Sequence, residues 1–217
     1  MREYHKIETV FERDTFGSKK LIPGVYRNET VAFLANNHWL FTEKIDGTNI
    51  RVCWDGHQIT FRGRTDKAEI PKHLLAKLTE IFLNDATEQL FEQIFGEKEV
   101  ILFGEGYGTK VQKCGDQYRS DVGFILFDVL IGDIYLARRS ASLYNVESIA
   151  KMFGLEIVPV VLVGTIDDAI NFVKSEPDST IGTAKMEGVV GHPYVEVCDR
   201  LGKRVIVKIK VRDFKEG

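Results

Sequence analysis

The sequence predicts a mixed α+β fold built on antiparallel sheets. Segments rich in β-branched and aromatic residues outnumber helical segments, and tight-turn dipeptides separate them, so that the strands follow one another as hairpins. Apolar residues recur at helical spacing from Pro71 to about Phe95, which predicts helices in the middle of the chain. Strands clustered in hairpins favour this class over a doubly wound parallel sheet, in which strands and helices alternate.

Short apolar runs bounded by turn residues mark the expected strands. Residues 39–52, WLFTEKIDGTNIRV, predict two strands joined by a tight turn at Asp46-Gly47. Lys44 then stands at the end of the first of these strands, where rigid backbone holds its side chain at the mouth of the turn. The other expected strands cover residues 59–62, 100–103, 122–130, 187–190 and 205–211.

Capping residues mark the expected helices. Pro71 is typical of a first helical turn and Gly96 of a helix end, while Asn84-Asp85 can divide the stretch between them into two helices. Two further helices are expected, at residues 142–153 closed by Gly154 and at residues 167–174 capped by Thr165.

Length and composition predict a globular protein rather than a membrane or secreted one. The chain has 217 residues, 44% of them hydrophobic, and we expect a single domain over residues 1–217. Its apolar runs are far shorter than the ~20 residues of a membrane-spanning helix, and its first residues are too charged for a signal peptide. Three widely separated cysteines indicate a reduced, cytoplasmic protein with no membrane association.

The net charge of −3 disfavours a surface that is basic throughout, but the basic residues are concentrated locally. Six lysines and arginines lie in the last fifteen residues, 203–217. A strip of this kind can bind phosphate groups even on an acidic protein. The composition therefore leaves nucleic acid open as a partner.

Three lysines are candidate catalytic residues. A lysine attacks as a nucleophile only when its amine is neutral, and a fixed position at a strand end suits Lys44 to that role. Side chains alternate along a strand, so Lys208 and Lys210 share one face, about 7 Å apart, while Val207 and Ile209 face the core. Such a pair can neutralise phosphate charge. Taken singly, Lys44 is more often a solvated lysine of a surface hairpin, and Lys208 and Lys210 are more often solvated residues of an exposed strand face.

Two glutamates and one phenylalanine are candidate ligand-binding residues. Glu105 in FGEG and Glu187 in MEGVV are expected at the ends of apolar strands beside glycines, where a carboxylate can receive a ribose hydroxyl or a divalent metal ion. Phe127, expected at another strand end, can offer a flat face to a purine base. Each of the three is also an ordinary turn or core residue elsewhere.

The order of these motifs is more informative than any one of them alone. KIDG, RGR, FGEG, FILFDV, EGVV and VKIK follow one another between Lys44 and Lys210. The series resembles the covalent nucleotidyltransferase superfamily, which contains ATP-dependent RNA ligases, DNA ligases and mRNA capping enzymes. The resemblance implies a nucleotidyltransferase fold, the ATP-grasp-like adenylation fold of DNA and RNA ligases, with antiparallel β-sheets flanked by helices.

Two details make the chain most similar to the RNA ligase 2-like branch. KIDGTN ends in Asn49, where DNA ligases and capping enzymes usually carry arginine, and Arg64 follows Lys44 by 20 residues. In this resemblance Lys44 attacks the α-phosphate of ATP and becomes a lysyl-AMP intermediate, with Mg²⁺ or Mn²⁺ as the metal. The resemblance implies Arg64 and Glu105 at the sugar, Phe127 stacked on adenine, Glu187 with Glu105 at the metal, and Lys208 and Lys210 at the phosphates. Glu43, Lys44 and Asn49 complete the implied set of cofactor-binding residues.

The function that this resemblance implies is ATP-dependent RNA ligation. AMP passes from Lys44 to the 5′-phosphate of an RNA end, at a nicked duplex or a break under repair, and a 3′-hydroxyl then displaces it. The chain ends directly after the paired lysines, so we expect an adenylation domain without a C-terminal OB-fold or helical domain, with a protein partner supplying RNA-binding surface. The alternatives are a minimal ATP-dependent DNA ligase and a non-catalytic nucleic-acid-binding module that retains the fold.

Overall fold

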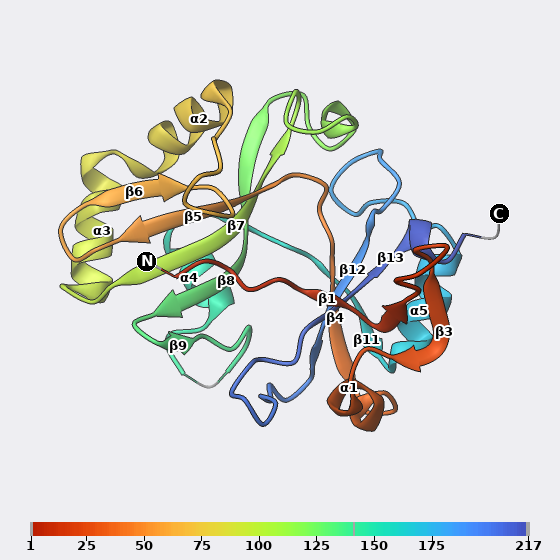
Figure 1. Ribbon diagram of the computed structural model, residues 1–217. Helices are drawn as coiled ribbons and strands as arrows, with labels where there is room; N and C mark the ends of the chain where they lie inside the picture. The colour runs from red at the N-terminus through yellow and green to blue at the C-terminus, as the bar shows by residue number, and fades with distance from the viewer. Residues whose placement is uncertain (1, 141, 216–217) are drawn as a thin grey trace. The chain divides into compact units, whose positions relative to one another are not determined.

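The computed structural model describes residues 2–140 and 142–215. These residues form two compact units, which are described in turn (Figure 1). The first unit contains residues 2–4 and Asp46–Val158, and the second contains His5–Ile45 and residues 159–215. Within the described residues, no helix combines the length and the apolar character needed to cross a membrane. The α+β class with mainly antiparallel sheets is confirmed.

A six-stranded sheet forms the centre of the first unit. Its strand order is β10-β8-β7-β5-β6, with β9 paired to β8, and every pair except β8–β10 is antiparallel. The strands are β5 (Thr48–Trp54), β6 (Ile59–Arg62), β7 (Val100–Gly108), β8 (Val122–Ile131), β9 (Ile134–Tyr135) and β10 (Glu156–Ile157).

Three helices of the first unit pack on one face of this sheet, because they and the strands bury a common apolar core. They are α2 (Lys72–Phe82), α3 (Asp85–Phe95) and α4 (Val146–Met152), and a short 3₁₀ turn, η1 (Gly115–Gln117), follows β7. The predicted division at Asn84 is confirmed: the Asn84 side chain accepts a hydrogen bond from the Thr87 N–H and so caps α3. The helix expected from residue 142 begins later, after the cap residue Asn145.

The predicted hairpin over residues 39–52 is wrong. The strand before Asp46 pairs with β11 (Val160–Gly164) and β12 (Gly188–Pro193), whereas the strand after Gly47 pairs with β6 and β7, so the two lie in different sheets. Gly47 is needed for a close approach instead of a turn, since a Cβ there would stand 2.4 Å from the carbonyl oxygen of Gly106. A glycine within a strand pattern is a sequence cue for such a close approach of another backbone.

The predicted strand end at Glu105 is wrong, because β7 continues beyond the apolar run 100–103 that marked it. The expectation that Phe127 ends a strand is also wrong, because β8 continues to Ile131, close to the range 122–130 expected for it. Glu105 lies inside β7, between Asn49 of β5 and Ile125 of β8. Phe127 lies inside β8, at a register shift where Phe103 pairs with Asp128 but Gly104 pairs with Leu126. Phe127 is the extra residue of this β-bulge, a feature that redirects a side chain without ending the strand.

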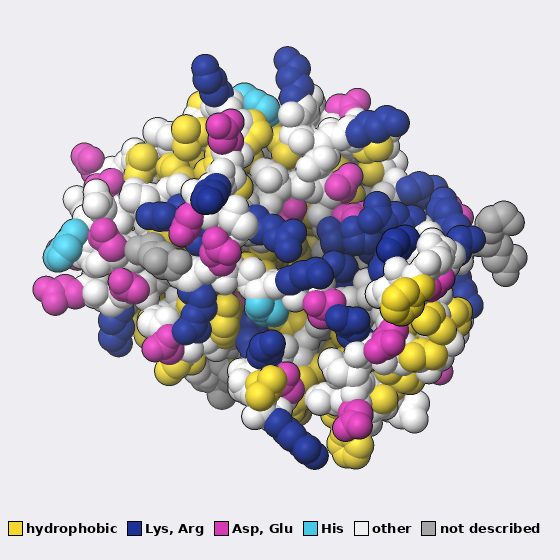
Figure 2. All heavy atoms as spheres, in the orientation of Figure 1, with side chains coloured by type: hydrophobic (Ala, Val, Ile, Leu, Met, Phe, Trp, Pro, Cys, Tyr) yellow, Lys and Arg dark blue, Asp and Glu magenta, His cyan; other side chains and the backbone are white. Residues whose placement is uncertain are grey.

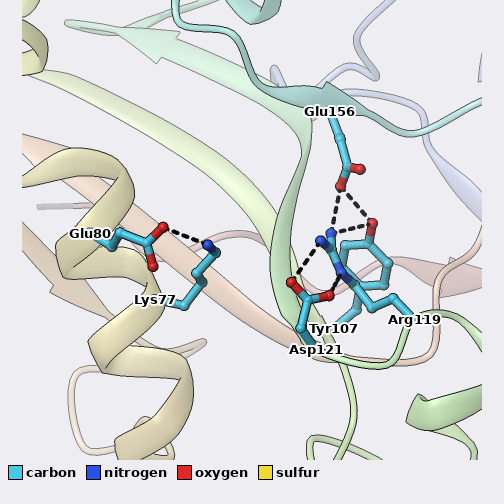
Figure 3. A network of polar contacts seen from close by, with 6 residues as sticks. All are labelled: Lys77, Glu80, Tyr107, Arg119, Asp121 and Glu156. Atoms are coloured by element: carbon cyan, nitrogen blue, oxygen red, sulfur yellow. Dashed lines mark hydrogen bonds and ion pairs between the residues drawn. The ribbon is translucent and has the colours of Figure 1, made fainter.

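The segment that joins β7 to β8 is held in place by a polar network (Figure 3). Arg119 bonds the Asp121 carboxylate through two nitrogens, at 2.6 and 3.2 Å, and also donates to Tyr107 Oη and Glu156 Oε2. Tyr107 Oη in turn donates to Glu156. Burial, followed by the bond to Glu156, raises the pKa of Tyr107 to about 12, so the phenol remains a donor at neutral pH. Gln112 of this segment donates to the Gly47 carbonyl at 2.9 Å.

The second unit is built on a five-stranded sheet of order β1-β13-β12-β4-β11 and a two-stranded sheet of β2 and β3. The strands are β1 (Glu8–Thr9), β2 (Phe11–Arg13), β3 (Leu21–Tyr26), β4 (Trp39–Glu43), β11 (Val160–Gly164), β12 (Gly188–Pro193) and β13 (Val207–Lys210). The helical segments are α1 (Glu29–Leu34), α5 (Ile166–Lys174) and η2 (Val211–Asp213). The Thr165 cap of α5 is confirmed by its hydrogen bond from the Asp168 N–H.

The face of β13 that was predicted to be apolar packs into the core of the second unit. Val207 and Ile209 are each 1% exposed, and the apolar side of α5 belongs to the same core. Lys208 and Lys210 alternate with these residues and are only half-buried. The alternation therefore fixes which face of the sheet carries the lysines.

Replacing Gly104 of β7 tests its close packing against β8 beside the bulge. A Cβ at this position would lie 2.2 Å from the Phe124 ring and 2.6 Å from the Ile125 carbonyl oxygen. We expect Gly104→Ala to lower the free energy of unfolding by about 2–3 kcal/mol through overpacking. Gly132→Ala is the control: its φ of +58° imposes strain of about 1 kcal/mol, but its Cβ would meet nothing within 4 Å. Equal losses in denaturant titrations of the two variants would contradict the packing argument.

Candidate active site

One carboxylate joins two of the three candidate catalytic lysines in the second unit. Lys44 Nζ lies 2.5 Å from Glu187 Oε2, and Lys210 Nζ lies 2.5 Å from Glu187 Oε1. The side chains of Lys44, Glu187 and Lys210 are between 14% and 24% exposed. We call Lys44, Glu187, Lys208 and Lys210 the lysine cluster. Figure 2 shows Lys and Arg side chains gathered over β13 and the segment after it.

The strand order of the sheet creates this cluster. β12 lies between β4 and β13, and the N–H of Lys44, just after β4, donates to the Gly188 carbonyl at 2.9 Å. Gly188 is also opposite Lys210 in the β12–β13 register. A Cβ on Gly188 would come within 2.2 Å of the Ile209 carbonyl oxygen and 2.7 Å of the Lys210 Cα. The glycine of EGVV therefore allows β13 to approach Glu187 and Lys44.

Lys208 adds a third positive charge to the cluster. Burial, followed by the charges of Lys210 and Lys44, lowers the pKa of Lys208 below its ordinary value. Three ammonium groups and one carboxylate carry a net charge of +2, so the cluster attracts anions.

Glu187 itself is held in its charged form. Burial alone would raise the pKa of Glu187, but the charge of Lys44 and the hydrogen bonds from Lys210 and Lys44 outweigh it and lower the pKa. A carboxylate with this pKa is ionised throughout the neutral range. Carboxylate oxygens are also ligands that Mg²⁺ and Mn²⁺ accept, so the chemistry of Glu187 fits a divalent metal. Within the described part of the chain, no group of three or more His, Cys, Asp or Glu side chains forms a metal-binding cluster.

Glu43 stands next to Lys44 but faces a loop. Its side chain is buried, with the residue 1% exposed, and Ser179 Oγ donates to Oε1 at 2.5 Å. The Thr180 N–H and Thr180 Oγ1 donate to Oε2 at 2.9 and 2.6 Å. Both oxygens of this predicted nucleotide-binding residue thus anchor the segment that leads into Glu187. No local pattern indicates Ser179 and Thr180 as partners of Glu43, because they lie 136 and 137 residues away from it.

Two other predicted site residues are neighbours in the first unit. Asn49 of β5 is directly opposite Glu105 of β7, so their side chains leave the same face of the sheet. Ile50, next to Asn49, is buried in the core with the helices, so this polar face is the one away from them. Asn49 Oδ1 is buried and has no hydrogen-bond partner within the described residues. A buried amide oxygen without a donor suits a site that a ligand completes.

The Phe127 ring is half-buried, and Tyr4 packs edge-on against it with ring centroids 5.1 Å apart. Tyr4 also contacts Phe103 at 4.8 Å and donates from Oη to the buried Asp128 carboxylate at 2.9 Å. The bulge and this contact fix the direction of Phe127. Tyr4 is a residue that the sequence analysis missed, because nothing in the sequence links the amino terminus to β8.

Arg64 follows β6 and is exposed, and its side chain makes no hydrogen bond or ion pair with any residue that the structure describes. The predicted residues thus divide between the units. Lys44, Glu187, Lys208 and Lys210 come together in the second unit, with Glu43 beside them. Asn49 and Glu105 come together in the first unit, which also carries Phe127 and Arg64.

The lowered pKa of Glu187 predicts a dependence of stability on pH. A depressed carboxyl pKa stabilises the folded state fully above the ordinary value of 4.5, and this stabilisation is lost as the pH falls through the lower folded value. We expect wild type to be more stable than Glu187→Gln at pH 7, and the difference to shrink as the pH falls below 4.5. Denaturant titrations of both proteins from pH 7 to pH 3 measure it. A difference that stays constant would contradict the ion pairs.

Glu43 allows a second prediction. Glu43→Ala leaves two hydroxyls and one N–H of the 179–180 segment without their acceptor, so we expect a loss of about 2–3 kcal/mol in the free energy of unfolding. Glu43→Gln should cost less, since an amide keeps one acceptor for the Thr180 N–H and a serine hydroxyl can reverse to accept from the amide nitrogen. If Glu43→Gln is as unstable as Glu43→Ala in thermal and denaturant unfolding, the hydrogen bonds are not what stabilises this contact.

Comparison with known proteins gives the same fold and a family. The sequence profile of the RNA ligase family matches residues 37–210, which is most of the chain. No curated protein matches it. Among solved structures, a Naegleria gruberi RNA ligase mutant with ATP and Mn is 18% identical, with a TM-score of 0.64, over 97% of this chain and 56% of that one.

Two more structures of the Naegleria gruberi RNA ligase extend the comparison. A mutant with AMP and Mn is 16% identical, with a TM-score of 0.60, over 94% of this chain and 60% of that one. The ligase with PPi is 17% identical, with a TM-score of 0.60, over 95% and 61%. This chain thus spans little more than half the length of these proteins, with which it shares the fold. The match of the family profile over residues 37–210 places the chain in the RNA ligase family.

Proposed function

We propose that this chain is an ATP-dependent RNA ligase that works through a lysyl-AMP intermediate on Lys44. In the first step, Lys44 Nζ loses its proton and attacks the α-phosphorus of ATP, a P–N bond forms, and pyrophosphate leaves. The AMP then passes to the 5′-phosphate of an RNA end. A 3′-hydroxyl attacks that phosphate, the strands are joined, and AMP is released.

The observation that carries this proposal is the lysine cluster. A nucleophilic amine held beside two further lysines and one carboxylate stands in a field that favours the phosphates of a nucleotide. Nucleotidyl transfer depends mainly on positioning and charge neutralisation, and Lys208 and Lys210 supply charge for the pyrophosphate that leaves. Membership of the RNA ligase family supports the same assignment.

The first unit contributes the groups that suit a nucleoside. We assign Arg64 and Glu105 to the sugar and Phe127 to the adenine ring. The buried Oδ1 of Asn49 has no partner within the described residues, so we assign it as the acceptor for a hydrogen-bond donor of the nucleotide. Glu43, in the second unit, is assigned to nucleotide binding through its place beside Lys44, and its carboxylate acts by anchoring Ser179 and Thr180.

A divalent metal, Mg²⁺ or Mn²⁺, fits the same assignment. Structures of the Naegleria gruberi ligase contain ATP with Mn and AMP with Mn, and Glu187 and Glu105 supply carboxylate oxygens that such ions accept. The metal, when bound, neutralises phosphate charge.

The wider setting is also a proposal. We assign both units to one adenylation domain over residues 1–217 that joins or repairs RNA ends, including those at a nicked duplex. A protein partner that supplies further RNA-binding surface is part of the same proposal. Three free cysteines favour a reducing, cytoplasmic location.

Transfer of label to Lys44 tests the first step. Purified protein, shown by mass to carry no AMP beforehand, is mixed with Mg²⁺ and α-labelled ATP, then denatured and separated. We expect a labelled band with ATP, none with α-labelled GTP or labelled NAD, and none in Lys44→Ala, because alanine lacks the attacking nitrogen. Lys72→Ala, a change of an exposed lysine in α2, is the matched control and should label like wild type. Equal labelling of Lys44→Ala and wild type would overturn the proposal.

The choice between RNA and DNA needs a second assay. Nicked duplexes that differ only in the sugar of the 3′-hydroxyl strand separate the two, because the 2′-hydroxyl distinguishes RNA from DNA at such a site. We expect faster sealing with RNA on that side. Equal or faster sealing of an all-DNA nick would identify a minimal DNA ligase, and RNA binding without any covalent nucleotide would identify a non-catalytic module.

A further inference from the structure

Arg51 is a buried cation on the polar face of the six-stranded sheet. It lies in β5, opposite Phe103 of β7 and Arg62 of β6, and it is 0% exposed. Its neighbours along the strand, Ile50 and Val52, belong to the core with the helices, so Arg51 points to the other face, which Asn49 shares. Burying a guanidinium is unfavourable unless its N–H groups are bonded, so the partners of Arg51 indicate its purpose.

Two of those partners bracket Arg64, and the third is the Arg2 carbonyl, at 3.4 Å from the other terminal nitrogen. Arg51 Nε donates to the Gly63 carbonyl at 2.8 Å, and one terminal nitrogen donates to Asp66 Oδ1, also at 2.8 Å. The first contact is one residue before Arg64 and the second is two residues after it. A planar guanidinium with both bonds formed fixes the separation and orientation of the two anchors. Arg64 thus lies on a short loop whose two sides are tied to one rigid strand.

Other contacts converge on the same loop. The hydrogen bond from Arg51 is the main reason that the pKa of Asp66 is below its ordinary value, so the carboxylate stays ionised. Arg62 also donates to Asp66 Oδ1, at 3.3 Å, and the Asp66 N–H donates to Glu3 at 3.1 Å. Gly63 is packed closely enough that a Cβ would lie 2.8 Å from that of Ala68. By contrast, the exposed Arg64 side chain has no partner within the described residues.

We propose that Arg51 is a positioning residue for nucleotide binding, which fixes residues 63–66 so that the Arg64 guanidinium is presented to the sugar of ATP. The inference rests on the proposed function, because it takes Arg64 as a nucleotide contact. Arg51 itself touches no substrate. A buried cation whose two shortest bonds bracket an arginine without a partner among the described residues is explained by this role, whereas an apolar residue would fill the same buried position equally well.

A double-mutant cycle tests the proposal. The initial rate of Lys44 labelling is measured against ATP concentration for wild type, Arg51→Met, Arg64→Ala and the double variant. We expect each single change to raise the ATP concentration at half-saturation about tenfold, with a smaller effect on the rate at saturation. Because Arg51 acts through Arg64, the double variant should be no worse than Arg64→Ala alone. Lys67→Ala, an exposed neighbour on the same loop, is the control and should match wild type.

The outcomes separate this inference from the proposed function. Multiplied effects in the double variant, or unchanged half-saturation in Arg51→Met, would overturn the positioning role while labelling of wild type persists. No labelling of wild type by ATP would overturn the proposed function, on which the inference rests.

A milder change keeps the test decisive if Arg51→Met does not fold. The Asp66 side chain is half-exposed, so Asp66→Asn is a mild change, and it weakens only the anchor after Arg64. We expect a smaller rise in half-saturation, about threefold, that disappears in the Arg64→Ala background. An effect of Asp66→Asn that persists in that background would overturn the proposal.

Discussion

The ion pairs of Glu187 are the interaction on which the candidate active site depends. Strands β4 and β13, which flank β12, bring Lys44, Lys208 and Lys210 to one place, and three ammonium groups there would repel one another. Glu187 compensates two of them directly and leaves a net positive charge. The geometry requires Gly188, because a side chain at that position would collide with β13. The charge that stabilises the fold in this region is therefore the charge that suits a phosphate ligand.

The first unit places its candidate site residues on one face of a single sheet. Its helices cover one face with an apolar core, and the opposite face is free to carry polar and aromatic groups. Asn49 and Glu105 are neighbours there because β5 and β7 are antiparallel and in register. The bulge at Phe127 turns one ring out of the regular alternation. Tyr4 then fixes that ring by an edge-on contact.

Charged side chains hold segments in place at three points of the described structure. Glu43 accepts three hydrogen bonds from residues 179–180, Arg51 holds residues 63–66, and Arg119 ties the β7–β8 connection to Glu156. In each case a strand or its neighbour fixes the position of a segment that has few apolar contacts of its own. A satisfied charged group is well suited to this role, because its bonds are directional and its burial would be unfavourable without them. Several candidate functional residues lie beside such anchors.

The sequence by itself determined the fold class, the helix caps at Asn84 and Thr165, the face of β13 that carries Lys208 and Lys210, and the motif series that indicates the RNA ligase family. These features depend on local periodicity and residue type, which the chain carries at every position. The tertiary structure alone decided that the strands flanking Asp46-Gly47 lie in different sheets, that Glu105 and Phe127 are inside strands, and that Glu187 joins Lys44 to Lys210. It also decided the partners of Glu43 and Arg51. Strand pairing and side-chain contacts between distant residues depend on which segments meet when the core closes, and no local pattern specifies that choice.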